Sequence, residues 1–323
     1  MLTCVLLVPA RGAAQESADS NLARARRILR TTPLVDGHND LAWRIRQDKS
    51  APHDVEAYDL RRATPGHTDL ARMKEGMVGA QFWSVYIPGE IKDSGYARVQ
   101  LEQIDIARRF IAKYPERFAF ATRASDIKAD FAKGKVASFL GMEGGHAIEN
   151  SLGALRAYYD LGVRYMTLTH NVTLDWADAA LDQPKHGGLT PFGKEVVREM
   201  NRMGMLVDLA HVSPGTMSAA LDVSEAPVIF SHSGARALVD HPRNVPDSIL
   251  ARLPKNGGIV MVPFVNSFVS KAVRARDVAE EQAAKDAAIE HPNDSAAVTR
   301  AMDAWRTAHP PAVASVSDVA DHI

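Results

Sequence analysis

The sequence predicts a single (β/α)8 barrel of the TIM type, and three features of the chain indicate it. From about Leu34 onward, short apolar runs alternate with amphipathic stretches, which is the pattern of repeated βα units around a parallel sheet. Seven such units follow one another, and no glycine-rich phosphate loop follows the first run, as it would in a doubly wound sheet. The length of 323 residues fits one barrel domain.

Seven apolar runs are expected to form the strands. They are residues 34–38, 78–86, 136–142, 163–169, 205–210, 226–231 and 258–264. Apolar residues at helical spacing predict the intervening helices 96–114, 152–161, 191–203 and 214–223. Ser213 and Pro214 form a typical helix start, a capping hydroxyl followed by proline at the first helical position. We expect an outer helix over 16–30, and solvated helices without a catalytic role over the charged, alanine-rich segment 274–310.

Composition excludes several classes of partner. The 38 basic and 39 acidic residues nearly balance, so no global charge draws the protein to nucleic acid or to an anionic membrane. No stretch reaches the roughly 20 apolar residues of a membrane span. Residues 1–15 are apolar and then small, like a shortened secretion signal, so we expect export from a bacterium and one barrel domain over 16–323. With Cys4 as its only cysteine, the chain must hold any metal ion through nitrogen and oxygen.

Candidate metal ligands stand where the predicted strands end. Catalytic groups of a barrel come from the carboxyl ends of its strands, so these side chains are expected to meet at one mouth. They are His38 and Asp40 after the first run, Glu143 after the third, His211 after the fifth and His232 after the sixth. Any one of them alone fits an ordinary polar turn or a buried histidine, but their recurrence at successive strand ends favours a metal site.

The spacing of these residues predicts a two-ion site. His38 and Asp40 are two apart on an extended chain, so their side chains point the same way and can share one ion. His211 and His232 can bind a second ion, and the Glu143 carboxylate can bridge both. Two such cations acidify a bridging water and polarise a carbonyl, which amide hydrolysis at neutral pH requires. Hydrolysis through a metal-bridging hydroxide is therefore the expected reaction.

Further residues near the same mouth are candidates for substrate binding and catalysis. His170 is surplus to the five ligands and can hydrogen-bond a tetrahedral oxyanion, although a structural histidine remains an alternative. Arg243 carries a planar fork suited to a substrate carboxylate, although surface arginines are common. Trp43 also belongs near this mouth. The minor candidates, which could equally be wall or packing residues, are His146, Asp175, Trp176 and Asp178.

Taken together, the motifs resemble those of the membrane (renal) dipeptidase family, within the metallo-dependent hydrolase type of barrel. The matching segments are 36–40 (DGHND), 141–146 (GMEGGH), 165–171 (YMTLTHN), 207–211 (VDLAH), 230–233 (FSHS) and 243–247 (RNVPD). The resemblance implies two zinc ions held by His38 and Asp40 and by His211 and His232, with Glu143 between them. It also implies that His170 and Arg243 hold a dipeptide and that Trp43 lies near the site. A homodimer is a further possibility.

One departure from the family pattern affects the expected activity. The sequence has no Gly-x-Asp-Phe-Asp-Gly motif, which in the family ends an eighth strand and supplies a proton-handling aspartate. We therefore expect a barrel without its eighth strand and with unpaired edges on the first and seventh strands. The alternative to a dipeptidase is a catalytically impaired protein that still binds metal or peptide. Another barrel amidohydrolase is disfavoured, because that group usually has His-x-His on the first strand.

Overall fold

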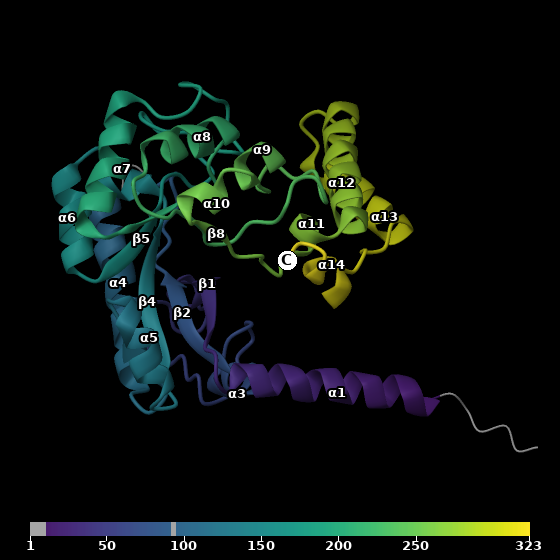
Figure 1. The fold of residues 1–323 in the computed structure, drawn as a ribbon. Coiled ribbons are helices and arrows are strands. Elements are labelled where there is room, and N and C mark those ends of the chain that lie inside the picture. The colour runs from purple at the N-terminus through teal and green to yellow at the C-terminus, as the bar shows by residue number, and fades with distance from the viewer. Residues whose placement is uncertain (1–10, 92–94) are drawn as a thin grey trace, which may run out of the picture.

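The computed structural model describes residues 11–91 and 95–323. Of the signal-like segment 1–15, residues 1–10 lie outside the described residues, and the remainder belongs to helix α1 (Arg11–Leu29), which includes the predicted outer helix. In Figure 1, α1 extends away from the sheet. No helix in the described part of the chain has the length and apolar character needed to cross a membrane.

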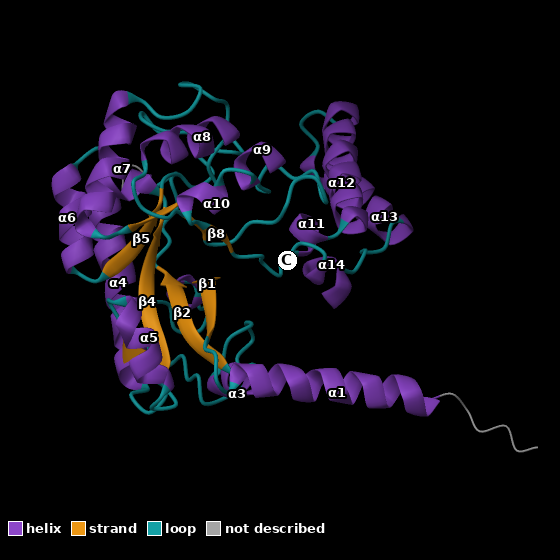
Figure 2. Cartoon of the chain, in the orientation of Figure 1, coloured by secondary structure: helices purple, strands orange, loops and turns teal. Residues whose placement is uncertain are grey.

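A curved parallel sheet forms the centre of the molecule, as predicted (Figure 2). Its strands are β1 (Leu34–Asn39), β2 (Val78–Ser84), β3 (Phe118–Phe120), β4 (Val136–Glu143), β5 (Val163–Thr167), β6 (Leu206–Asp208), β7 (Ile229–Phe230) and β8 (Ile259–Val260). Hydrogen bonding runs in the order β1-β2-β4-β5-β6-β7-β8. All seven predicted strands are present, although the last three are shorter than the apolar runs that predicted them.

The count of seven strands was wrong by one, because β3 was missed. This strand has three residues and pairs in parallel with β4 through Phe118 and Val136, on the edge that β5 takes over further along. A three-residue run is too short to show an alternating pattern in the sequence. It pairs with the first residues of β4, so it lies at the opposite end of that strand from Glu143 and the site.

Helices cover the outer face of the sheet, and the four predicted between strands are confirmed. These are α4 (Tyr96–Lys113), α6 (Leu152–Asp160), α7 (Pro191–Met203) and α8 (Pro214–Val223). Ser213 caps α8 by accepting a hydrogen bond from the Thr216 amide, with Pro214 in the first turn. The remaining helices before the C-terminal region are α2 (Leu41–Arg46), α3 (Leu70–Glu75), α5 (Ala124–Phe131), the 3-10 helix η2 (Gly145–Ile148), α9 (Asp247–Leu250) and α10 (Leu253–Asn256).

The C-terminal region is helical and mostly exposed, as the charged segment 274–310 predicted. It comprises α11 (Asn266–Val269), α12 (Lys271–Glu290), α13 (Ser295–Ala308) and α14 (Val316–Ala320). Helices α12 and α13 pack side by side at one end of the molecule in Figure 1.

Alternating positions of the strands create two apolar layers. One cluster gathers on the concave face and contains Ala80, Phe82, Ala137, Phe139, Tyr165 and Ile229. The intervening residues, such as Leu140 and Met166, belong to the larger cluster that joins the sheet to its helices. Toward the carboxyl ends of the strands, the positions on this same concave face become polar. They are Ser84, Glu143, Thr167, Asp208 and Ser231. The fold therefore collects polar side chains at the carboxyl end of the sheet.

The sheet curls into a barrel that lacks one strand, which confirms the predicted fold. Strands β1 and β8 are the two ends of the hydrogen-bonded path, and no strand in the described residues joins them. The curl still brings the two ends near each other at Gly37, where an added Cβ atom would lie 2.2 Å from Met261 Sδ and 2.4 Å from the Ser231 carbonyl oxygen. A larger residue at position 37 would push β1 away from the end of β7.

Candidate metal centre

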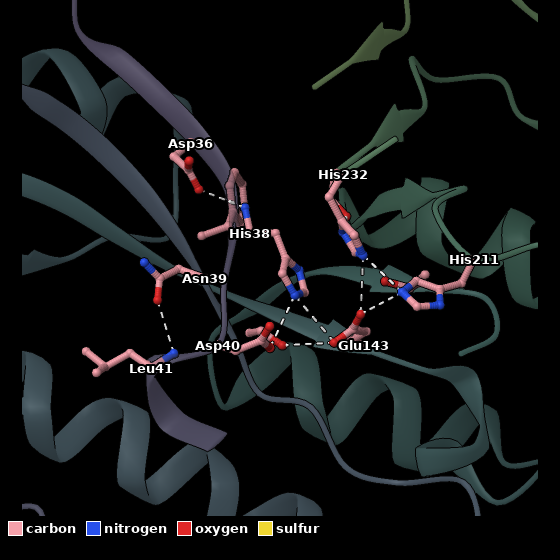
Figure 3. A network of polar contacts seen from close by, with 12 residues as sticks. Asp36, His38, Asn39, Asp40, Leu41, Glu143, His211 and His232 are labelled. Carbon is pink, nitrogen blue, oxygen red and sulfur yellow. Dashed lines mark hydrogen bonds and ion pairs between the residues drawn. The ribbon is translucent and has the colours of Figure 1, made fainter. Parts of the chain in front are cut away.

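Five side chains from four different strand ends meet around Glu143, the last residue of β4 (Figure 3). His38 lies near the end of β1 and Asp40 follows that strand. His211 and His232 follow β6 and β7. His211 adopts a positive φ of 67°, a backbone conformation that non-glycine residues rarely take and that is common at functional sites.

The two oxygens of Glu143 face different histidines. Its Oε1 atom lies 2.9 Å from His211 Nε2 and 3.4 Å from His232 Nε2. Its Oε2 atom lies 3.5 Å from His38 Nε2 and accepts a hydrogen bond of 3.2 Å from the Ser84 hydroxyl. The carboxylate therefore lies between one histidine on its Oε2 side and two on its Oε1 side.

Asp40 takes part at the edge of this group. Its Oδ1 atom lies 3.2 Å from His38 Nε2. The Asp40 side chain is 55% exposed, whereas that of Glu143 is only 5% exposed, so Asp40 lies at the open side of the cluster.

Each of the three histidines is held from behind through its other ring nitrogen. His38 Nδ1 lies 3.0 Å from the Tyr165 hydroxyl, and His211 Nδ1 lies 3.0 Å from Asn171 Oδ1. His232 Nδ1 lies 2.8 Å from the Ser231 hydroxyl. Such contacts fix the ring orientation, and wherever Nδ1 carries the proton, Nε2 keeps the lone pair that binds a metal ion.

Burial and charge set different protonation states for these histidines. Burial lowers the pKa of His211 well below its usual value, with Arg243 adding to the effect, and it lowers the pKa of His232 to about 4, helped by the charge of His38. Burial also opposes protonation of His38, but Glu143 and Asp40 outweigh it and raise the pKa of His38 to about 10.

The pKa of Glu143 responds to the same charges. Burial would raise it, but the charge of His38 and the close contacts with His211 and His232 hold it well below the usual value. A proton on His38 Nε2 therefore neutralises the buried carboxylate, and a cation arriving between them would have to displace that proton.

The donor set fits a divalent metal ion. Ligand atoms of His38, Glu143 and His232 lie within 4.8 Å of one another, and so do those of Glu143, His170 and His211. Imidazole nitrogens and a carboxylate are the ligands that zinc and similar ions take when thiolates are absent.

A cavity of about 2020 Å³ opens over this cluster, and all eight residues predicted as ligands or substrate contacts line it. His170 lies beside His211, with ring centroids 4.3 Å apart, and its Nδ1 atom is buried without a hydrogen-bond partner in the described structure. Burial lowers the pKa of His170. Trp43 reaches the same cavity and contacts Tyr86 edge to face, at a centroid distance of 5.0 Å.

Arg243 is 5% exposed and contributes its guanidinium to the cavity wall. Its group lies over the Phe268 ring at 5.2 Å, and one Nη2 donates a long 3.5 Å hydrogen bond to the His232 carbonyl. The Nε atom has no partner among the described residues. Burial lowers the pKa of Arg243 to about 10, which leaves it charged at neutral pH.

The four minor candidates are not among the described residues that line the cavity. His146 is buried and its Nε2 contacts the Ile87 carbonyl at 2.9 Å, which attaches η2 to the loop after β2. Asp178 accepts hydrogen bonds from the Lys185, His186 and Gly188 amides and so shapes its own loop. Trp176 is buried against Phe192, and exposed Asp175 accepts a hydrogen bond from Asn150.

Several residues of the site were missed from the sequence. Tyr86 lies between Trp43 and His170 in the cavity wall, and its ring centroid is 4.7 Å from that of His170. The partners of the histidine Nδ1 atoms were missed as well, namely Tyr165, Asn171 and Ser231. Ser84, which contacts Glu143, and Asp208, which contacts Ser231, were also missed. Each stands at a strand end or in the same strand face as a candidate ligand, a signal that could have found them.

Solved structures share this fold. The probable dipeptidase PvdM from Pseudomonas aeruginosa matches with a TM-score of 0.76 and 20% identity, over 94% of this chain and 82% of that one. A metallopeptidase from Rhodobacter sphaeroides, liganded with a phosphinate mimic of the dipeptide L-Ala-D-Ala, matches with a TM-score of 0.66 and 24% identity, over 88% and 94% of the two chains. An amidohydrolase from Pseudomonas aeruginosa gives 0.62 and 23%, over 77% and 67%.

The family to which the chain belongs follows from its sequence as a whole, since the motifs quoted above all lie within one continuous match. The model of the membrane dipeptidases matches residues 22–323, which is nearly the entire chain. The chain therefore belongs to the membrane dipeptidase family, peptidase family M19.

Proposed function

We propose that this protein is a zinc-dependent dipeptidase with two metal ions. His38 and Asp40 would hold one ion, His211 and His232 the other, and Glu143 would lie between them. When bound, the ions supply the positive charge that polarises a carbonyl group and acidifies a water molecule.

The observation that most supports two ions is the division of the Glu143 carboxylate. Oε1 faces His211 and His232, while Oε2 faces His38, which Asp40 contacts from the open side. A single ion would need all these donors to converge on one point. The separate orientation of the two oxygens instead suits a carboxylate that bridges two cations.

Arg243 and His170 are the proposed substrate contacts. A buried guanidinium is costly unless it is paired, and the Arg243 Nε atom in the cavity wall still lacks a partner in the described structure. A substrate carboxylate would supply one and would fix the orientation of the dipeptide. The unpartnered Nδ1 of His170, beside His211, can hydrogen-bond the oxygen of the carbonyl that is attacked.

The first test is hydrolysis of Gly-D-Ala by the purified protein with added zinc. The Rhodobacter relative bound to a mimic of L-Ala-D-Ala makes a D-residue at the second position a reasonable choice. Zinc-dependent turnover is expected, with loss of more than about 100-fold in Glu143→Ala, because removing even an outer partner of a ligand costs 10 to 100-fold. Arg243→Lys is expected to raise KM, because a lysine cannot form the paired hydrogen bonds.

The surface substitution Arg252→Lys serves as the matched control, since Arg252 pairs with Asp222 and does not line the cavity. Zinc binding without any turnover would refute the dipeptidase and would favour the alternative, a protein that binds metal or peptide without catalysis. Absence of zinc binding would refute the zinc-dependent dipeptidase and would leave only the peptide-binding form of the alternative.

The signal-like residues 1–15 support a further proposal, that the protein is exported from a bacterial cell. Fractionation of cells that express the full chain should then find the protein outside the cytoplasm and shortened at its N-terminus. A full-length protein in the cytoplasmic fraction would contradict export.

A further inference from the structure

Asp208 is a fully buried carboxylate beneath the metal centre, and the proposed mechanism leaves it without a role. It lies at the end of β6, three residues before His211. Its Oδ1 atom accepts hydrogen bonds from the amides of Ala210 (3.1 Å) and Ser231 (2.8 Å). Its Oδ2 atom accepts from the hydroxyls of Thr167 (2.6 Å) and Ser231 (2.7 Å).

These contacts determine where the protons lie on the neighbouring residues. Ser231 has one hydroxyl proton, and it donates that proton to Asp208. The Ser231 oxygen can then only accept from His232 Nδ1, which lies 2.8 Å away. A neutral His232 with its proton on Nδ1 has a lone pair on Nε2, the atom that faces Glu143 and lies 2.9 Å from His211 Nε2.

We propose that Asp208 is a positioning residue that acts through Ser231 to fix the tautomer of His232, so that His232 Nε2 can bind a metal ion. This inference rests on the metal site of the proposed function. The Nδ1 atoms of His211 and His38 face Asn171 and Tyr165 instead, so only His232 has Ser231 directly behind its Nδ1 atom.

Asp208→Asn tests this idea because it reverses the chain of hydrogen bonds at nearly constant volume. The backbone amides of Ala210 and Ser231 require an acceptor, so the oxygen of the new amide stays at the Oδ1 position. Its NH₂ group then faces the Ser231 hydroxyl, which turns its own proton toward His232 Nδ1. His232 must move its proton to Nε2, where it blocks the metal ion.

Two measurements follow, and neither uses turnover. In the metal-free protein, ¹⁵N NMR of the histidine side chains should show the Nδ1–H tautomer of His232 in the parent and the Nε2–H tautomer in Asp208→Asn, with His232→Gln used to assign the signals. Zinc titration against a chelator should show one site weakened by about 10 to 100-fold and the other little changed.

Thr167→Val is the matched control, since it removes the other hydroxyl from the same Asp208 oxygen without touching Ser231. It should keep the Nδ1–H tautomer, with zinc affinity within a few-fold of the parent. An unchanged tautomer in folded Asp208→Asn, or equal losses of zinc affinity in both variants, would overturn the proposal.

Ser231→Ala provides the second route if Asp208→Asn does not fold. It removes the hydroxyl that connects Asp208 to His232 Nδ1 and should leave His232 as a mixture of tautomers. A pure Nδ1–H tautomer of His232 in Ser231→Ala would also overturn the proposal. A parent that binds zinc and shows these tautomers but fails to hydrolyse dipeptides would contradict the proposed function and leave this inference standing.

Discussion

The two sides of the candidate metal centre are built differently. His38 and Glu143 come from a first wall of long strands, β1, β2, β4 and β5, which have 6, 7, 8 and 5 residues. His211 and His232 come from a second wall, β6, β7 and β8, with 3, 2 and 2 residues. Strands β2 and β4 pair over five successive residues, whereas β6 and β7 pair only through Asp208 and Ile229.

The difference shows two ways of holding a ligand. In the first wall, long strand ladders hold the backbone, and β1 pairs with β2 at Asp36 and at Asn39, on either side of an irregularity that contains His38. In the second wall, the candidate ligands stand on loops, and side-chain hydrogen bonds that involve Asn171, Ser231 and Asp208 replace the missing ladder. We expect the first wall to contribute more to the free energy of unfolding. We expect metal binding by the second wall to be more sensitive to loss of a polar partner.

The largest expected effect contrasts one apolar strand residue from each wall. Leu140 in β4 is fully buried, whereas Ile259 in β8 is 52% exposed. Leu140→Ala should lower the free energy of unfolding by about 2–5 kcal/mol through lost burial and the cavity left behind. Ile259→Ala should change it by no more than about 0.5 kcal/mol. Urea denaturation of the metal-free protein measures both, and equal losses would contradict the contrast.

The next effect compares the partners of two histidines. Asn171→Ala removes the acceptor behind His211, which stands on a loop, and should weaken zinc binding by about 10 to 100-fold. Tyr165→Phe removes the hydroxyl behind His38, but pairing of β1 with β2 on both sides of His38 still holds its backbone. We expect a loss below about 10-fold there. Zinc competition titrations measure both affinities. A larger loss of zinc affinity in Tyr165→Phe than in Asn171→Ala would contradict the difference between the two walls.

The smallest effect, taken per pH unit, is a pH dependence of stability that should be similar on both sides. Burial lowers the pKa of His146 near the first wall and of His241 near the second to about 4, from 6.5. Between pH 6.5 and 4 the unfolded chain therefore binds protons that the folded protein excludes. Stability should fall as pH falls through this window, by at most about 1.4 kcal/mol per pH unit for each histidine.

His146→Gln and His241→Gln should each make that loss shallower by a similar amount, because glutamine does not titrate and still offers hydrogen bonds. Urea denaturation at pH 7, 6 and 5 gives the slopes. If stability depended less on pH in only one of the two variants, the two walls would also differ in how strongly they disfavour a protonated histidine.

Prediction from the sequence succeeded where a periodic signal was long. The apolar runs at 78–86 and 136–142 gave strands of nearly those bounds, and helices 191–203 and 214–223 were located to the residue because each has a cap followed by proline. Strand β3 was missed, and β7 and β8 came out shorter than expected, because two or three paired residues leave no alternation to detect.

The sequence by itself determined that histidines and carboxylates would stand at the ends of parallel strands, because the two-residue period of a strand and the common direction of its neighbours make those ends converge. The sequence predicted that His38, Glu143, His211 and His232 would meet, and all four line one cavity. Only the tertiary structure decided which oxygen of Glu143 faces which histidine, and which residue stands behind each ring. Those contacts join residues up to 127 positions apart, and they depend on the curl of the sheet, which no local pattern encodes.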